Sequence, residues 1–266
     1  MGFIVDTEKW MGGKVSDRVT CVRAENPSPM TYVGTNTWIL AEPDCPECIV
    51  IDPAPAGEHI ENVLNECINQ GLRVGAIVLT HCHADHTEGA DDLEAMTGAR
   101  IYAPFDGTLV EGEFCPIEGG PVLQALEIHG HSSDSIGLLY EADDSMFTGD
   151  VVFRHGPTVV YHPDGVLQDY MDSLDLLQGA VEAGKVSVFY PGHGYPIEDP
   201  IRCVEATRKH RNDRLNQIIN ALAEGVERDA DALVDAVYTD IDPKLRPAAL
   251  KSVQAQLLYL DSKKEE

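Results

Sequence analysis

Thr80-His81-Cys82-His83-Ala84-Asp85-His86 contains three imidazoles and one carboxylate within six consecutive residues. Imidazole and carboxylate groups are ligands that suit zinc, iron or manganese. A loop this short cannot wrap all of them around one ion. Alternation sends His81 and His83 to one side of the chain, whereas Asp85 and His86 can turn toward a second position. The stretch therefore indicates two adjacent metal sites whose remaining ligands come from elsewhere in the chain.

Residues that could complete these sites follow short apolar runs typical of strands. They are His131 after residues 122–128, Asp150 after residues 137–140, and His193 after residues 186–190; Asp52 follows residues 49–51 in the same way. Polar side chains at strand ends meet where those ends converge on one edge of a sheet. We therefore expect His131, Asp150 and His193 to supply the missing ligands.

In this order the five segments resemble the five motifs of the metallo-β-lactamase superfamily, over about residues 20–200. The resemblance implies an α/β (α+β) fold, a four-layer αβ/βα sandwich in which two sheets pack face to face with helices outside. It implies one metal site formed by His81, His83 and His131. It implies a second site formed by Asp85, His86 and His193, with Asp150 bridging both ions and Asp52 orienting a ligand rather than binding metal.

Three further stretches narrow the resemblance. Residues 26–37 resemble the N-terminal signature of the β-lactamase-like protein 2 branch, and residues 168–174 also fit that branch. Residues 209–219 resemble the helix that opens its C-terminal lobe and, less closely, glyoxalase II.

Two domains are expected: a catalytic domain over residues 1–200 and a small helical, winged-helix-like lobe over residues 201–266. A hairpin is predicted from residues 31–40 and 48–52, and strands at residues 76–79 and 101–103. Apolar spacing predicts helices over residues 58–70, 87–97, 169–182, 200–224, 230–239 and 243–261.

The composition is that of an ordinary globular protein, with 43% hydrophobic and 24% charged side chains among 266 residues. The net charge of −26, from 45 acidic and 19 basic residues, repels polyanions and makes a nucleic-acid partner unlikely. No apolar stretch is long enough to span a membrane, and the N-terminus lacks a basic region followed by an apolar core. We expect a cytoplasmic protein that acts on a small molecule. Its oligomeric state stays open.

The seven cysteines show no regular spacing, as expected for reduced residues in the cytosol. Cys45 and Cys48 are predicted to flank a turn between strands rather than bind zinc, because no second ligand pair lies nearby. Cys82 is predicted to pack behind the metal cluster.

The chemistry expected is that of two divalent ions, with zinc favoured and iron or manganese as alternatives. Such a pair lowers the pKa of a shared water toward about 7, and Asp85 and Asp150 would orient the resulting hydroxide. A protein nucleophile is not predicted, because Gly-x-Ser-x-Gly is absent. The leading prediction is a zinc-dependent hydrolase that directs a metal-bridging hydroxide at a small ester or thioester.

Other functions stay open. A phosphodiesterase or endoribonuclease acting on single-stranded RNA is implied by the resemblance to animal members of the branch. A non-catalytic metal-binding protein is the second alternative, and iron in place of zinc would favour a dioxygenase. The predicted substrate contacts are Asn36, His155, Tyr161 and Arg211. Arg211 lies in a basic stretch that, by resemblance to glyoxalase II, would hold the carboxylates of a glutathione thioester.

Overall fold

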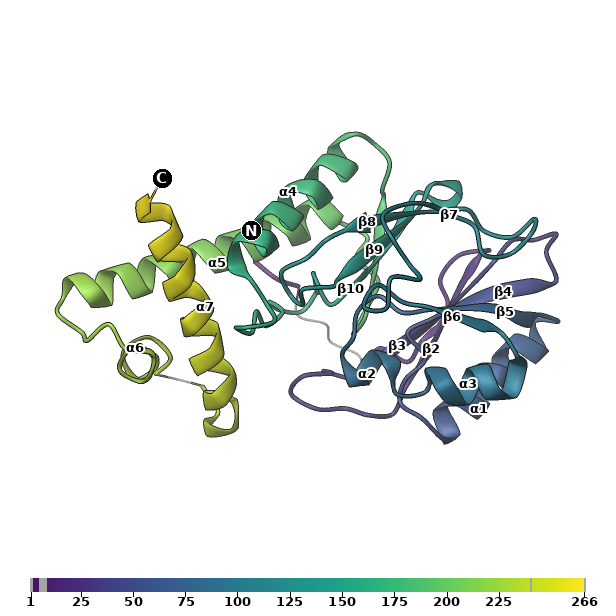
Figure 1. Cartoon of the computed structure of the whole chain (residues 1–266), viewed down its shortest axis with the longest axis horizontal. Coiled ribbons are helices and arrows are strands. Elements are labelled where there is room, and N and C mark those ends of the chain that lie inside the picture. The colour runs from purple at the N-terminus through teal and green to yellow at the C-terminus, as the bar shows by residue number, and fades with distance from the viewer. Residues whose placement is uncertain (1, 5–8, 240, 266) are drawn as a thin grey trace.

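The computed structural model describes residues 2–4, 9–239 and 241–265. Residues 1 and 5–8, part of the N-terminal stretch behind the cytoplasmic expectation, lie outside this description. Two β-sheets form the body of the molecule, with helices on their outer faces and a helical C-terminal part to one side (Figure 1).

The first sheet has six strands among the described residues, in the order β1-β2-β3-β4-β5-β6. They are β1 (Gly13–Lys14), β2 (Val19–Arg23), β3 (Asn36–Ala41), β4 (Glu47–Ile51), β5 (Arg73–Val78) and β6 (Arg100–Tyr102). Strands β1 to β4 are antiparallel neighbours, whereas β4, β5 and β6 run parallel. The predicted hairpin is confirmed, since Trp38 of β3 lies opposite Ile51 of β4 and Cys45 lies in the turn that joins them.

The second sheet, in the same described part of the chain, has the order β11-β10-β9-β8-β7. Its strands are β7 (Gly112–Phe114), β8 (Leu123–Glu127), β9 (Ile136–Tyr140), β10 (Ser145–Gly149) and β11 (Val188–Pro191). Strands β7 to β10 are antiparallel neighbours, and β10 and β11 are parallel. It follows that β8, β10 and β11 all run in the same direction.

Both faces of the central strands are buried. Trp38 of β3 and Phe147 of β10 pack between the two sheets. On the other face of the first sheet, Ile39 and Val50 pack with α1 (Glu58–Asn69) and α3 (Ala90–Thr97). On the other face of the second sheet, apolar residues pack against α4 (Leu167–Glu182) and α5 (Pro200–Ala223). Strands buried on both sides need apolar residues at every position, which is why they read as continuous apolar runs. The predicted four-layer αβ/βα sandwich is confirmed.

The C-terminal lobe is helical in its described residues. Helix α6 (Ala230–Val237), the 3₁₀ helix η2 (Pro243–Leu245) and α7 (Arg246–Glu265) follow α5. Ile218 of α5, Leu233 of α6 and Val253 of α7 meet in a separate apolar cluster. Helix α7 also packs on the two-sheet body through Ala255, which joins the apolar cluster beside α4. The predicted domain boundary falls at the start of α5.

One helix differs from the prediction of residues 87–97. The structure has a short helix α2 (Ala84–Thr87) and then α3, which begins at Ala90. The predicted helix is interrupted at Gly89, whose backbone N–H donates to Pro53 O at 3.0 Å. A Cβ at position 89 would lie 2.6 Å from that oxygen, so the close approach requires glycine. Asp85 and His86 therefore lie on a helical turn rather than in an extended loop.

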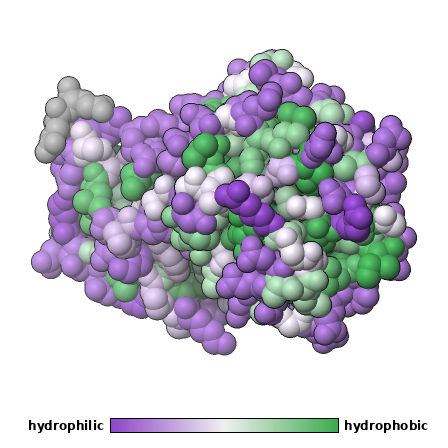
Figure 2. Space-filling model, turned by 45° about the vertical axis from the view of Figure 1, so that its right-hand side comes forward, coloured by the Kyte–Doolittle hydropathy of each residue, from purple (hydrophilic) through white to green (hydrophobic). Residues whose placement is uncertain are grey.

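The surface mixes charge with isolated apolar side chains. On the face drawn in Figure 2, hydrophilic residues form most of the outline and hydrophobic residues gather between them. Among the described residues, no helix is long and apolar enough to cross a bilayer.

Candidate metal centre

Strand direction brings the predicted ligands to one edge of each sheet. In the first sheet, Asp52 directly follows β4, and the loop beginning near His81 follows β5, its parallel neighbour. In the second sheet, His131 follows β8, Asp150 directly follows β10, and His193 follows β11. Because parallel strands end at the same edge, these polar residues collect over the apolar layer between the sheets.

Two backbone contacts join the two edges. Thr35, just before β3, forms an isolated antiparallel bridge with His193. The N–H of Ile136, at the start of β9, donates to Thr80 O at 2.9 Å. The loops of the two sheets are thus tied together at the point where the polar side chains meet.

The first group of potential ligands consists of His81, His83 and His131, whose ligand atoms lie within 4.8 Å of one another. His83 Nδ1 and His131 Nε2 are 3.0 Å apart. Two nitrogens bound to one tetrahedral ion at 2.0–2.1 Å would be about 3.3 Å apart. The spacing of this group therefore suits a single ion.

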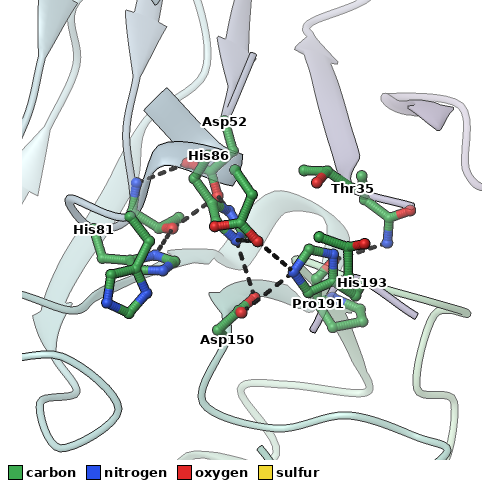
Figure 3. Close-up of polar contacts among 12 residues, drawn as sticks. Thr35, Asp52, His81, His86, Asp150, Pro191 and His193 are labelled. Atoms are coloured by element: carbon green, nitrogen blue, oxygen red, sulfur yellow. Dashed lines mark hydrogen bonds and ion pairs between the residues drawn. The ribbon is translucent and has the colours of Figure 1, made fainter. Parts of the chain in front are cut away.

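The second group consists of Asp85, His86, Asp150 and His193, again with ligand atoms within 4.8 Å. His193 Nε2 lies 3.3 Å from both Asp85 Oδ2 and Asp150 Oδ2, and His86 Nε2 lies 3.3 Å from Asp150 Oδ1. Figure 3 shows Asp150 between His86 and His193. Asp150 Oδ2 is also 3.8 Å from His131 Nε2, so this carboxylate faces both groups.

Unpaired polar atoms show that the cluster fits cations. Within these two groups, four buried atoms make no hydrogen bond to the described part of the chain: Nε2 of His81, His86 and His193, and Oδ1 of Asp150. All but the first have ion-pair contacts at 3.3 Å, and a buried polar atom without a hydrogen bond costs about 1–3 kcal/mol. Imidazole nitrogens and carboxylate oxygens are metal ligands, so divalent ions held among them would satisfy these atoms. The residues present therefore fit divalent metal ions.

The two groups differ in charge. Burial, together with His86 and His131, lowers the pKa of His81 well below its usual range, so this imidazole is neutral. Burial alone would lower the pKa of His193 as well, but Asp150 and Asp85 outweigh it and raise that pKa to about 9. In the same way Asp150 and Asp52 raise the pKa of His86 well above its usual range, against the effect of burial.

Asp150 carries the matching negative charge. Burial would raise the pKa of this carboxyl, but His193 and His86 outweigh it and hold that pKa well below its usual range. The second group is therefore an array of paired charges, and the first contains neutral imidazole.

Asp52 orients the imidazole rings of His86 and, through Thr80, of His81. Its Oδ2 lies 2.9 Å from His86 Nδ1, and its carboxylate accepts from Thr80 N at 2.8 Å and Thr80 Oγ1 at 2.7 Å. Thr80 Oγ1 in turn lies 3.0 Å from His81 Nδ1. Asp52 is buried and has φ of 54°, in the left-handed region. It thus holds one imidazole of each group, directly or through Thr80.

Other outer contacts were not anticipated from the sequence. His131 Nδ1 lies 2.8 Å from Val159 O, and His83 Nε2 lies 3.3 Å from Asp164 Oδ2. Asp164 Oδ1 also accepts from the N–H and the hydroxyl of Ser133. Nothing in the sequence distinguishes Asp164 from other loop carboxylates, because its partners lie 31 and 81 residues away.

The predicted substrate contacts have different positions. Asn36 is buried and donates to Pro191 O at 2.9 Å and Gly194 O at 2.8 Å, so it holds the segment that carries His193. Arg211, only 6% exposed, donates to Thr158 O at 2.5 Å and lies over the ring of Tyr170.

The other basic residues near Arg211 are also engaged. Arg208 pairs with Asp175, Lys209 with Asp213, and Arg214 lies over the Tyr238 ring. The structure therefore places the guanidinium of Arg211 under the loop of residues 151–166 rather than beside the metal cluster.

His155 lies beside the cluster. A cavity of about 310 Å³ lies there, and His155 forms part of its wall. The other lining residues are Ser28, Pro29, Met30, Tyr32, His131, Asp150, Phe153, Gly156, Pro157, Thr158 and Val159. Tyr161 is half-buried and is not among the lining residues. The lining includes Tyr32 and Phe153, two aromatic residues that the sequence prediction missed, because only the fold brings their segments together.

The prediction for Cys82 is wrong. Cys82 is exposed instead of packed behind the cluster. Its neighbours His81 and His83 both turn toward the metal centre, and the residue between them in an extended segment points the opposite way, here into solvent.

Comparisons with known proteins agree with this geometry. The Metallo-beta-lactamase superfamily model matches residues 30–104 and 92–193. The model of the Beta-lactamase associated winged helix domain matches residues 230–263, which confirms the expected winged-helix-like lobe.

Two curated relatives and one solved structure illustrate the similarity. A Beta-lactamase-like protein 2 homolog of Caenorhabditis elegans is 29% identical over 93% of this chain and 85% of its own length. An Atrochrysone carboxyl ACP thioesterase of Aspergillus fumigatus is 33% identical over 84% of this chain and 70% of its own length. A metallo-beta-lactamase family protein of Thermus thermophilus superposes with a TM-score of 0.75 at 20% identity, covering 94% of this chain and 95% of that one. The chain therefore belongs to the metallo-β-lactamase superfamily, whose members are hydrolases.

Proposed function

We propose that this protein is a binuclear metal-dependent hydrolase of small thioesters or esters, with zinc as the first candidate metal. The observation that carries the proposal is the set of four buried ligand atoms that make no hydrogen bond and lie within the two groups of potential ligands. His81, His83 and His131 would hold one ion, and Asp85, His86 and His193 the other, with Asp150 between them. When bound, such a pair supplies Lewis acidity, lowering the pKa of a shared water and polarising a carbonyl oxygen.

The chain's own residues orient this centre. Asp52 fixes the ring of His86, and Thr80 fixes that of His81. Val159 O sets the tautomer of His131 by accepting from Nδ1, so that Nε2 faces the centre. Asp85 Oδ2 and Asp150 Oδ2 both lie 3.3 Å from His193 Nε2, so either carboxylate can accept a proton or orient a water there. Because Asp150 is buried, its charge acts in a medium that screens it weakly.

The lining of the cavity supports a carbonyl substrate rather than a polyanion. No lysine or arginine is among the described residues that line it, and the chain carries a net charge of −26. RNA recognition depends on cations that contact phosphates. The Aspergillus fumigatus relative is named as a thioesterase, which supports the same choice.

A substrate panel tests the proposal. Protein loaded with zinc, and separately with iron or manganese, is assayed on S-acetyl-N-acetylcysteamine, S-lactoylglutathione, a p-nitrophenyl ester and a labelled single-stranded RNA. We expect thioester turnover that is lost on chelation and restored by metal. RNA cleavage that depends on the same ligands would favour a ribonuclease instead. Bound metal without turnover of any substrate would favour a metal-binding protein.

A further inference from the structure

An aromatic wall runs from the surface to the metal centre. The rings of Tyr32 and His155 are stacked, with centroids 3.7 Å apart and planes 10° from parallel. Phe153 stacks near His155 at 5.5 Å and 16°. Phe153 also contacts the ring of His193, a potential ligand, at 5.6 Å. Tyr32, His155 and Phe153 all line the cavity beside His131 and Asp150.

The outer end of this wall is held in place. Tyr32 has φ of 54°, a backbone conformation that is unfavourable for a bulky residue and persists only where surrounding contacts impose it. Thr31 supplies them: its hydroxyl donates to Asn26 O at 2.6 Å, and its carbonyl accepts from Gly34 N at 2.8 Å. Tyr32 nevertheless remains 36% exposed, so one side of an ordered ring is available for a ligand.

The inner part of the wall is closely packed. His155 lies against Gly194, where an added Cβ would be 3.1 Å from Nδ1 of the imidazole and 3.5 Å from Tyr32. Gly194 also has φ of +77°. The segment that presents His193 therefore also fixes the aromatic wall.

The rest of the cavity lining is mainly apolar and, as far as the structure describes the chain, contains no lysine or arginine. Met30, which is 43% exposed, lines it together with Pro29, Pro157 and Val159, and Ser28 and Thr158 add hydroxyl groups. Among the described residues of the lining, the anionic group is Asp150, and no cation is present. Sites that bind glutathione or nucleotide thiols need cations for the carboxylates or phosphates, and this cavity supplies none.

We propose that the cavity binds a planar, uncharged group attached to the scissile thioester or ester, which lies against the Tyr32–His155–Phe153 wall while the carbonyl faces Asp150. This rests on the proposed hydrolase function and names its substrate class. Because these rings are stacked on one another, the wall offers the free face of Tyr32 and the edges of the stacked rings. Flat rings suit such a wall because stacking on Tyr32 and edge-to-face packing both add stabilisation beyond the area buried. The ring can belong to the acyl half or to the thiol half of the substrate, since either is bonded next to the carbonyl.

Matched substrates distinguish the two halves. Turnover of S-benzoyl- and S-acetyl-N-acetylcysteamine tests the acyl half, and S-benzyl against S-ethyl thioacetate, both with alkyl thiols as leaving groups, tests the thiol half. We expect about tenfold higher kcat/KM for the ring-bearing member of at least one pair. S-Lactoylglutathione should be the poorest substrate.

Variants at Tyr32 test the wall itself. Tyr32→Phe keeps the ring and should keep the preference for ring-bearing substrates, whereas Tyr32→Leu keeps apolar bulk and should lose most of that preference through a higher KM. Phe105→Leu is the control, because it removes an exposed ring that does not line the cavity. Thermal unfolding checks that each variant is folded.

A binding measurement gives a readout apart from turnover. Calorimetry uses thioether analogues of both substrate pairs, in which CH₂ replaces the carbonyl. In at least one pair the ring-bearing analogue should bind about tenfold more tightly than its ethyl counterpart, and Tyr32→Leu should abolish the difference. Thioester turnover with no ring preference in either pair, or a preference unchanged in Tyr32→Leu, overturns this inference alone. If no thioester or ester is turned over, the proposed function fails, and equal binding of the ring-bearing and ethyl analogues in both pairs would then overturn the inference as well.

Discussion

The two ligand groups of the metal centre are held in different ways. His86 and His193 pair with carboxylates and are almost completely buried. The first group depends on neutral partners and on a loop: His131 on Val159 O, and His83 on Asp164, which is half-exposed. Ligands that are held by buried charged groups should bind metal more tightly than ligands that are held by a surface loop. Metal affinity in this protein should therefore depend on the residues that hold the ligands, such as Asp52 and Asp164, as well as on the ligands themselves.

Asp150→Asn should have the largest effect, because this carboxylate faces both groups. We expect loss of both ions and about a 10³-fold lower kcat/KM, since metal polarisation contributes several kcal/mol to such reactions. Metal content by mass spectrometry and thioester turnover measure the effect. Asp91→Asn, on the exposed side of α3, is the matched control. Activity and metal content equal to those of the parent would remove Asp150 from the centre.

Asp52→Asn should weaken both groups by about 10–100-fold in metal affinity. Asparagine is close in shape to aspartate and tolerates a φ of 54°. The substitution therefore tests the negative charge that Asp52 presents to His86 and the oxygens that accept hydrogen bonds from Thr80. Competition with a chelator gives the affinities. An effect confined to one ion would show that Thr80 holds His81 without help from Asp52.

His131→Ala and His193→Ala separate the groups. His131→Ala should leave one ion bound by Asp85, His86 and His193, with affinity within about threefold of the parent value. His193→Ala should leave the other. Stoichiometry by calorimetry distinguishes one ion from two. Loss of both ions in either variant would mean that the groups form a single cooperative site.

Asp164→Asn should have the smallest effect, about tenfold on the affinity of the first group and none on the second. The reason is that Asp164 touches His83 from a half-exposed position, where solvent weakens the pairing. Ser133→Ala, which removes one donor to Asp164, should reproduce part of the loss. An equal loss of affinity for both ions would contradict the view that the surface loop supports only the first group of ligands.

The sequence was sufficient to predict residues that reach the metal centre because they follow the end of a strand. His131, Asp150 and His193 follow apolar runs, and parallel strands end at one edge, so sequence order was enough to place them together. The hairpin and the helices of the C-terminal lobe could also be predicted, because the spacing of their apolar residues is local in the sequence. The start of α3 was missed because Gly89 depends on a contact with Pro53, 36 positions earlier in the chain.

Asn36 and Arg211 show what sequence order cannot supply. Both are polar residues in recognisable motifs, and both were expected to contact substrate. In the fold, Asn36 holds the backbone near His193, and Arg211 holds Thr158 under the loop. A polar side chain binds whichever partner the fold brings near it, and here that partner is the protein's own backbone.

By itself the sequence determined the superfamily, through the resemblance carried by five ordered motifs, and that resemblance implied the sandwich and the seven candidate ligands. Local periodicity and the order of strand ends added the positions of the helices and the expectation that the polar residues meet at one edge. The tertiary structure alone decided that Asp164 supports His83, that Cys82 faces solvent, and that Tyr32 stacks on His155. The reason is physical: these outcomes depend on loops whose conformation is set by contacts between residues far apart in the chain, and such contacts leave no periodic trace in the sequence.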